Sequence, residues 1–513
     1  MRDLGARDSG LLIRAGFQSR VPSPQPLVLM RTTILALLLA TTAPGQDEFR
    51  LYTEHPRLFL TPQRLRLLKR ERDRESMRWR QFDLLVRAAA EMPEPGFALA
   101  LHYAVTGDAA IGKKAVDWAL GPGTDLRQLA LVYDWCQPLL SPTQSRALET
   151  KLRKLAALKT GPDLPAARDR ILALIATADD THAEENPLRE MVQGWWRTQI
   201  APKLADGRVM VPLDQVFALC EILHATRDNL KIDLREDAPS YFRELPTYQV
   251  LANYPAPLSA PENEYRIPVY RGSGQPDLDR AALSRAAGLS TVAYDNNALE
   301  SQYLQGWLIQ DRFMLQGIFG APYEFLWANP YQPGLSYFQL PVFFHDQHSG
   351  ALFLRSNWED DAVWFGIYAG EAQIFREGRV TVLNSKVNPG QSPKVPLGPK
   401  AEGIQVGDAS VLVGRSPMQF AMEGGRVLVV SLKPRSKYVV ETDDEEMSEF
   451  ETDGAGTLVL EYPGDWAAGV RIQEVLHGSD GTEVGVAASG LEPRTVASGG
   501  GRAIRGAADV STR

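Results

Sequence analysis

The sequence of 513 residues contains only two cysteines, Cys136 and Cys220, too few for a cysteine-ligated metal site. Both lie in apolar, helix-like segments, so we expect buried thiols, with one disulfide as the alternative in an oxidising compartment. A Gly-rich phosphate loop, a serine nucleophile elbow and clustered metal ligands are also missing. We therefore expect no metal and no cofactor.

Basic tracts are absent as well, and the formal net charge is -8. A nucleic-acid partner, which lysines and arginines would hold through counterion release, is not expected. An acidic glycan is still compatible, because a locally basic cleft can form on an acidic protein.

No apolar run is long enough to span a membrane, which takes ~20 residues. The segment "MRTTILALLLATTAPGQDEF" begins at Met30 with one arginine, continues through a short apolar stretch and reaches a small-x-small pattern before Gln46. This pattern predicts a secretory signal peptide, and hence a secreted or periplasmic protein. Residues 1–45 are assigned to this leader and to an upstream extension, residues 1–29, which precedes Met30, the better candidate for the start codon.

Amphipathic helical patterns occupy residues 46–330 and come in pairs. Thr61 and Pro62 are typical of a helix start, as are Ser141 and Gln144 in capping-box register. Gly107 and Asp108 separate two short helices. Such hairpins pack either as an open solenoid or as a closed α/α toroid, and the lack of a fixed repeat length disfavours the solenoid.

Residues 331–476 change to short segments rich in Val, Leu and aromatics, which predict a large antiparallel sandwich. Residues 363–368 are apolar on both faces and indicate a central strand. Residues 477–513 lose periodicity and are predicted to be a disordered tail. The fold class is thus α+β and multidomain, with an N-terminal α/α toroid (an incomplete α/α barrel) followed by a C-terminal antiparallel β-sandwich.

Three stretches resemble heparinase II/III-like polysaccharide lyases, and they occur in the family's order. They are "HPRLFLTPQRLRLLKR" (55–70), "LALVYDWCQPLLSPTQSRAL" (129–148) and "GALFLRSNWEDD" (350–361). The resemblance implies a toroid and a sandwich that act outside the cytoplasm on uronate-containing polysaccharides by β-elimination. That reaction needs a group that neutralises the carboxylate, a base and a proton donor.

The chain departs from the family at its catalytic positions. Where the family has His-x-His after the Arg-Ser-x-Trp strand, this chain has "YAGEAQIFREGRVTVL" without histidine. The catalytic tyrosine expected shortly after an Asp-Gly is missing after Asp206 and Gly207. For the carboxylate-neutralising asparagine, the corresponding segment offers only Asn186. These departures argue for altered chemistry or none.

The loop 260–274 concentrates the polar groups that elimination would need. Arg266 is the candidate carboxylate binder and Tyr265 the candidate proton carrier, and Tyr241 is a possible replacement for the missing tyrosine. Candidate substrate-binding residues are Asn263, Glu264, Arg271 and Trp327. The alternative is a structural loop, with Tyr241 and Trp327 as packing residues.

The remaining histidines favour ordinary structural roles. His345, Asp346 and His348 indicate a solvated hairpin turn rather than a metal pair, and His182 belongs to an acidic helix-start loop. His102 and His224 lie among apolar helical residues and are expected in the core.

Three hypotheses follow for the function of this protein. The first is an exported lyase-like protein that acts on acidic polysaccharide. The second is a catalytically silent relative that binds glycan, and the third is a toroid glycoside hydrolase, which needs two facing carboxylates. The glycan and the oligomeric state are open.

Overall fold

The computed structural model describes residues 51, 54–159, 161, 163–179, 183–207, 211–309, 313–383, 403–422, 425–443, 446–462, 468–475 and 505–506. The predicted leader and His182 lie outside these residues. All of the described residues belong to one compact unit, Phe49–Arg513.

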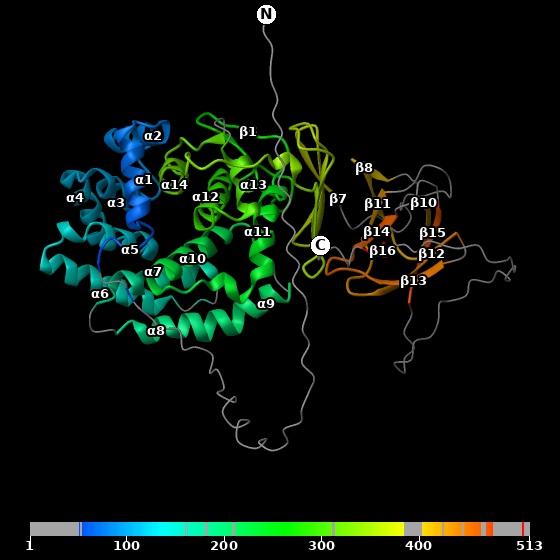
Figure 1. Ribbon diagram of the computed structural model, residues 1–513, viewed down its shortest axis with the longest axis horizontal. Helices are drawn as coiled ribbons and strands as arrows, with labels where there is room; N and C mark the ends of the chain where they lie inside the picture. Colours follow the sequence, from blue (N-terminus) through cyan, green and yellow to red (C-terminus); the bar gives the residue numbers. More distant parts are fainter. Residues whose placement is uncertain are drawn as a thin grey trace, which may run out of the picture. The chain divides into compact units, whose positions relative to one another are not determined.

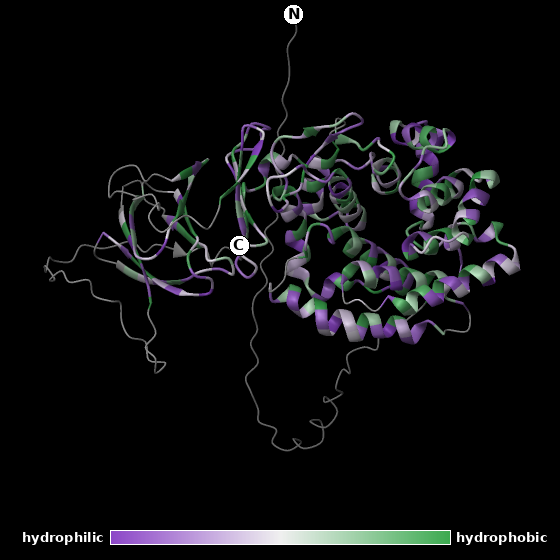
Figure 2. Cartoon of the chain, turned by 180° about the vertical axis from the view of Figure 1, so that it is seen from behind, coloured by the Kyte–Doolittle hydropathy of each residue, from purple (hydrophilic) through white to green (hydrophobic). Residues whose placement is uncertain are grey.

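The N-terminal part is helical, as predicted. Its helices are α1 Pro62–Asp73, α2 Met77–Arg87, α3 Pro95–Thr106, α4 Ala109–Leu120, α5 Leu126–Trp135, α6 Pro142–Leu158, α7 Leu164–Thr177, α8 Glu185–Arg189, α9 Ala201–Ala205, α10 Val216–Leu230, α11 Pro239–Leu251, α12 Leu278–Tyr294, α13 Leu299–Leu308 and α14 Gly320–Trp327, with a π-helix at Glu190–Ile200 between α8 and α9. In Figure 2 hydrophilic and hydrophobic residues alternate along most helices, as expected where one face is buried.

The predicted helix starts and breaks are confirmed. Thr61 caps α1 by accepting from the backbone N–H of Arg64, and Ser141 and Gln144 form the capping box of α6. Gly107 ends α3 at a φ of 75°, and Asp108 caps α4. Helices α1 and α2 are separated by a turn with Glu75 at a φ of 49°, and Ser76 caps α2.

Six of the described helices pack in a closed cycle of neighbours. Helix α3 packs on α5, α5 on α7, α7 on α10, α10 on α12, α12 on α14, and α14 on α3. Helices α4, α6, α11 and α13 each contact members of this cycle. Figure 1 shows the helices as one group, and α11 contacts strands β3 and β4 of the first sheet.

The C-terminal part is built from strands, and its first sheet has the order β3-β4-β5-β6-β7. Its strands are β3 Phe343–Asp346, β4 Ala351–Arg355, β5 Trp364–Tyr368, β6 Glu371–Arg376 and β7 Arg379–Leu383, all antiparallel. The prediction that β5 is central is confirmed. Its side chains alternate: Phe365 and Ile367 pack toward the second sheet, whereas Trp364 packs against the helical part.

Two further sheets follow, with the orders β16-β14-β11-β9-β8 and β10-β15-β12-β13. Their strands are β8 Ile404–Val406, β9 Ala409–Val413, β10 Met418–Met422, β11 Gly425–Val430, β12 Lys437–Thr442, β13 Glu446–Glu451, β14 Leu458–Tyr462, β15 Ala468–Glu474 and β16 Arg505–Gly506. Val411 and Leu428 share one hydrophobic cluster with the first sheet, and Leu412 and Val429 share another with the third.

Two features of the chain correct the sequence-based expectation. Strands β9 and β11 pair in parallel, so the sheets are not purely antiparallel. A two-stranded hairpin, β1 Leu258–Ser259 and β2 Glu264–Tyr265, interrupts the helical part. Of the predicted disordered tail, only Arg505–Gly506 is among the described residues, where it pairs with β14; the rest of the tail lies outside them, so the prediction is not tested. Pairing between strands distant in sequence depends on tertiary contacts, which local patterns do not encode.

Candidate functional site

A pocket of about 380 Å³ lies where the starts of α10 and α12 meet the turn between β5 and β6. We call it the junction pocket. Its polar lining consists of Asp214, Tyr270, Arg271, Gln275, Asp277, Arg280 and Tyr368. Asp214 follows Gly207 by seven residues, and Tyr368 is the last residue of β5, just before the segment without histidine.

Arg280 enters the junction pocket from the first turn of α12. Asp277 caps this helix by accepting from the backbone N–H groups of Asp279 and Arg280, at 3.0 and 3.2 Å. Arg280 Nη2 donates to the phenolic oxygen of Tyr368 at 3.4 Å. Its Nε is buried and has no hydrogen-bond partner among the described residues. A buried guanidinium N–H without an acceptor favours an anionic ligand.

Glu371 and Gln373 hold the loop that carries Tyr270 and Arg271. Gln373 Nε2 donates to the carbonyl of Tyr270 at 2.6 Å, and Glu371 Oε1 accepts from the N–H of Gly272 at 2.6 Å. The hydroxyl of Tyr254 donates to Gln373 Oε1 at 2.7 Å. These two side chains lie in the segment without histidine, and they position the loop.

The two tyrosines of the junction pocket differ in whether the hydroxyl proton already has an acceptor within the protein. Tyr270 donates its hydroxyl proton to the carbonyl of Gly274 at 2.7 Å, and burial raises its pKa. The Tyr368 oxygen accepts from Arg280, and its own proton has no acceptor among the described residues. Tyr368 is therefore the better proton donor to a bound ligand.

The predicted catalytic pair lies elsewhere. Tyr265 and Arg266 line a cavity of about 10 Å³, the size of one water molecule. The Arg266 guanidinium lies 4.4 Å from the ring centre of Trp307 and 3.9 Å from that of Phe313, and burial lowers its pKa to about 10. A cavity of this size does not hold a sugar in this conformation. The position of Tyr265 and Arg266 agrees with the alternative prediction that this loop is structural.

The neighbouring predicted residues also make internal contacts. Asn263 donates to the Tyr265 hydroxyl at 2.9 Å and accepts from the N–H of Gln316 at 2.7 Å. Glu264 lines the same small cavity. Burial raises the pKa of Tyr265, so its hydroxyl stays protonated.

Tyr241 and Trp327 are both buried. Tyr241 packs edge-on to Phe242 in α11, and burial raises its pKa. Trp327 is 1% exposed and packs against Phe59 and His224, so no face is open to a sugar ring. Of the predicted site residues, only Arg271 lines the junction pocket. Asp214, Arg280 and Tyr368 were missed: the strand pattern of residues 363–368 places Tyr368 on the same face as Trp364, but it indicates no site.

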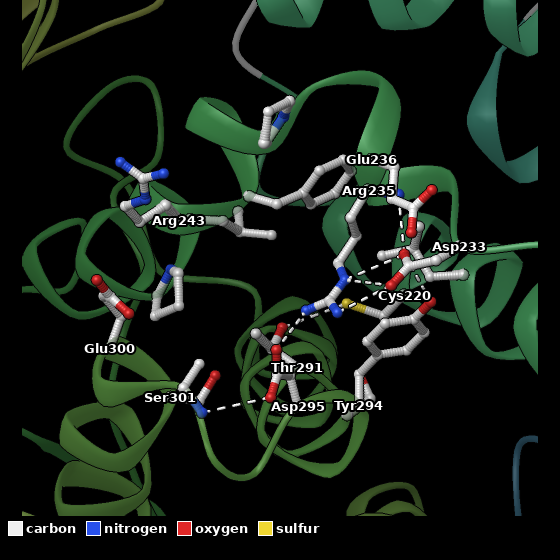
Figure 3. Close-up of a pocket in the computed structure, with 17 residues that line it drawn as sticks. Cys220, Asp233, Arg235, Glu236, Arg243, Thr291, Tyr294, Asp295, Glu300 and Ser301 are labelled. Atoms are coloured by element: carbon white, nitrogen blue, oxygen red, sulfur yellow. Dashed lines mark hydrogen bonds and ion pairs between the residues drawn. The ribbon is translucent and has the colours of Figure 1, made fainter. Parts of the chain in front are cut away.

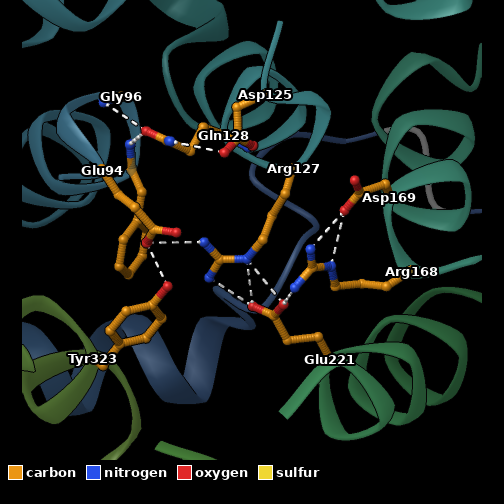
Figure 4. Close-up of polar contacts among 10 residues, drawn as sticks. Glu94, Gly96, Asp125, Arg127, Gln128, Arg168, Asp169, Glu221 and Tyr323 are labelled. Atoms are coloured by element: carbon orange, nitrogen blue, oxygen red, sulfur yellow. Dashed lines mark hydrogen bonds and ion pairs between the residues drawn. The ribbon is translucent and has the colours of Figure 1, made fainter. Parts of the chain in front are cut away.

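A second charged cluster, shown in Figure 4, lies among the helices of the closed cycle. Arg127 and Arg168 contact Glu221 at 2.7 and 3.2 Å, and Glu94 accepts from Arg127 and from the Tyr323 hydroxyl. Burial alone would lower the pKa of Arg127, but Glu221 and the other acceptors outweigh it and raise the pKa. None of these residues lines a pocket described here, so the network ties helices together.

A third pocket, of about 410 Å³, lies between α10, α11, α12 and α13 (Figure 3). Arg235 contacts both Asp233 and Asp295 at 2.9 Å, and Tyr294 donates to Asp233 at 3.0 Å. Burial opposes ionisation of Asp233, but the bonds from Arg235 prevail and hold its pKa below the usual value. A hydrolase acid needs the opposite shift, so Asp233 does not suit that role.

The two cysteines and the turn at His345 have structural surroundings. Cys136 and Cys220 are buried free thiols, so the disulfide alternative is not realised. His345 bonds Asp453 at 2.9 Å, and Asp346 caps the turn to β4 by accepting from Ser349 N. Within the described residues, no three His, Cys, Asp or Glu side chains form a metal-binding group, and no helix has the length and apolarity to cross a membrane.

The fold and sites define an α+β protein with a helical part and a following part made of sheets. No protein-family model and no curated protein matches the chain. Among matching solved structures is one described as a glycoside hydrolase, with 10% sequence identity and a TM-score of 0.28, covering 74% of this chain and 71% of that one. A TM-score this low supports no inference about fold or activity. The resemblance to heparinase II/III-like lyases therefore rests on the sequence motifs.

Proposed function

We propose that the protein binds an acidic, uronate-bearing polysaccharide in the junction pocket. The observation that carries this proposal is the pair Arg271 and Arg280, which faces a hollow large enough for a sugar unit. Neither guanidinium has an ion-pair partner among the described carboxylates. A uronate carboxylate would accept from these guanidinium N–H groups, and each such charged hydrogen bond contributes about 1.5–3 kcal/mol.

A second candidate function, β-elimination at the same pocket, is favoured by the hydroxyl of Tyr368. In this reaction the arginines would neutralise the uronate carboxylate, and the carboxylate of Asp214 would remove the proton on the adjacent carbon. Tyr368 would then protonate the departing glycosidic oxygen. The hydrolase alternative is less supported, because Oδ1 of Asp277, the other carboxylate in this pocket, caps α12.

The proposal also covers the architecture of the protein and its location. We infer that the closed cycle of helices is an α/α toroid and that the sheets form the sandwich of heparinase II/III-like lyases. The signal-peptide pattern at Met30 supports secretion or a periplasmic location, where such polysaccharides occur.

The test separates binding from chemistry by using three variants. Arg271→Gln should weaken binding of tetragalacturonate about tenfold in calorimetry, whereas Tyr368→Phe should bind normally. Arg376→Gln, an exposed arginine at the other end of β6, is the matched control and should behave as wild type. Unchanged binding in Arg271→Gln would refute the proposed site.

Ultraviolet absorbance of the unsaturated uronate product tests elimination with tetragalacturonate as the substrate. A signal in wild type that is lost in Tyr368→Phe would establish the lyase. Binding without any product would leave a silent glycan-binding protein, and new reducing ends without unsaturation would indicate hydrolysis.

A further inference from the structure

A larger hollow, of about 1330 Å³, lies at the opposite ends of the helices that form the junction pocket. It is bounded by the start of α1, the ends of α10 and α12, and residues 329–333. Arg280 and Ala293 line the two different pockets from one helix, and thirteen residues at 1.5 Å per residue separate them by about 20 Å. The two pockets are therefore distinct sites.

This hollow, which we call the arginine pocket, carries an excess of positive charge. Arg64, Arg66, Arg70 and Arg227 line it, against the single carboxylate of Asp228 among its described lining residues. Asp228 is already paired with Arg227 at 3.0 Å. Such a local excess contrasts with the formal net charge of -8 of the whole chain.

The three arginines of α1 that line this pocket, Arg64, Arg66 and Arg70, form no ion pair with any described carboxylate. Arg64 donates to the carbonyls of Leu326 and Trp327, each at 3.2 Å, and burial lowers its pKa to about 10. Arg66 and Arg70 are exposed and four residues apart, so two like charges lie on neighbouring turns of one helix, which is unfavourable without an anion.

The remaining lining is suited to a carbohydrate. The side-chain amides of Asn296, Asn297 and Asn329 line the pocket, and amides can both donate to and accept from sugar hydroxyls. Tyr331 is 40% exposed, and the Arg70 guanidinium lies 4.0 Å from its ring centre, which fixes both groups at the rim.

We propose that the arginine pocket is a second glycan site, which binds an anionic oligosaccharide carrying sulfate or carboxylate groups. Its arginines take the anionic groups and its amides take the hydroxyls. This site does not depend on chemistry in the junction pocket.

The first experiment is modification of the full chain with phenylglyoxal, read arginine by arginine by peptide mass spectrometry. The probes are a chondroitin sulfate tetrasaccharide, tetragalacturonate and neutral cellotetraose. Either acidic probe should slow modification of Arg66 and Arg70 about threefold or more, and cellotetraose should not. Chondroitin sulfate carries carboxylates as well as sulfates, so stronger protection by it than by tetragalacturonate would show that sulfate groups add to the binding.

Arg80 and Arg146, exposed arginines of α2 and α6, serve as internal controls. Protection of these two as strongly as Arg66 and Arg70 would show non-specific charge screening and overturn the proposal, as would no protection at all. Protection of Arg271 is read separately and reports only on the junction pocket, so the two proposals can fail independently.

A variant provides the second measurement. Arg66→Gln with Arg70→Gln should weaken calorimetric binding of the protecting probe about tenfold and reduce its salt dependence. Arg80→Gln with Arg146→Gln removes the same charge and should leave binding unchanged. Equal affinities in the two double variants would overturn the proposal.

Discussion

At the scale of single residues, the buried carboxylate of Glu221 is predicted to have a large effect on stability. It is fully buried and pairs with both Arg127 and Arg168. Glu221→Gln should lower the free energy of unfolding by about 3–5 kcal/mol, because two buried guanidinia lose a charged partner. Urea unfolding measures this change.

The matched control for that variant is Glu75→Gln. Glu75 pairs with Arg80 at 2.8 Å, but both side chains are mostly exposed, so the expected change is below about 1 kcal/mol. Equal losses in the two variants would contradict the structural role of the buried network.

A second residue-scale prediction concerns His224 and pH. Burial holds its pKa well below the usual value, with Nε2 donating to the carbonyl of Ser290 at 2.9 Å. The unfolded chain therefore binds the proton more tightly, and stability present above the unfolded pKa of about 6.5 is lost as pH falls toward the folded pKa. We expect a loss on the order of 1 kcal/mol per pH unit in that window.

The midpoint of urea unfolding, measured at pH values from about 7.5 to about 5.5 on either side of the unfolded pKa, tests this prediction. His224→Gln keeps a donor for Ser290 and should flatten the pH dependence, whereas His348→Gln, on an exposed turn, should not. The same slope in His224→Gln as in wild type would contradict the assignment.

At the scale of elements, helix α13 and the segment before β3 touch backbone to backbone. A Cβ on Gly306 would lie 1.8 Å from the carbonyl oxygen of Leu335, and one on Gly334 would lie 2.2 Å from the nitrogen of Gly306. Gly306→Ala should therefore lower the free energy of unfolding by about 1–3 kcal/mol through overpacking. Thermal unfolding measures it.

Gly194→Ala is the control for this contact. A Cβ there meets only the Glu190 side chain at 3.6 Å, and alanine favours a helix by about 1 kcal/mol over glycine. We expect unchanged or slightly raised stability. A loss equal to that of Gly306→Ala would mean that the close approach is not the cause.

At the scale of the whole molecule, the helical part and the first sheet share one hydrophobic cluster, so we expect them to unfold together. Trp364 is fully buried between them, and its Nε1 donates to the carbonyl of Leu251 at 3.0 Å. Trp364→Ala should cost about 3–5 kcal/mol. Far-UV circular dichroism, which reports mainly on the helices, and tryptophan fluorescence should shift to the same lower midpoint.

Leu84→Ala, an exposed position on α2, should leave both midpoints in place. A Trp364→Ala variant that keeps the helical midpoint of wild type would show that the helices are stable without the sheet.

The candidate site shows which functional residues can be predicted from sequence patterns and which cannot. Arg271 could be predicted as a binding residue because its loop lies between prolines and is rich in polar groups. The structure places it in the lining of the junction pocket. Arg280 was not predicted: its helix start is visible in the sequence, but its approach to Tyr368 across 88 positions is not. Tyr265 and Arg266 have suitable chemistry, yet the packing of Trp307 and Phe313 encloses them.

The sequence by itself determined the local elements of this protein. Capping residues, glycine breaks and the period of apolar residues depend on neighbours within a few positions, so the helix starts at Thr61 and Ser141 and the central strand β5 could be predicted. Tertiary structure alone decided the parallel pairing of β9 with β11, the arginine pocket and which polar residues stay open to solvent. These outcomes depend on contacts between distant segments, which no local pattern encodes.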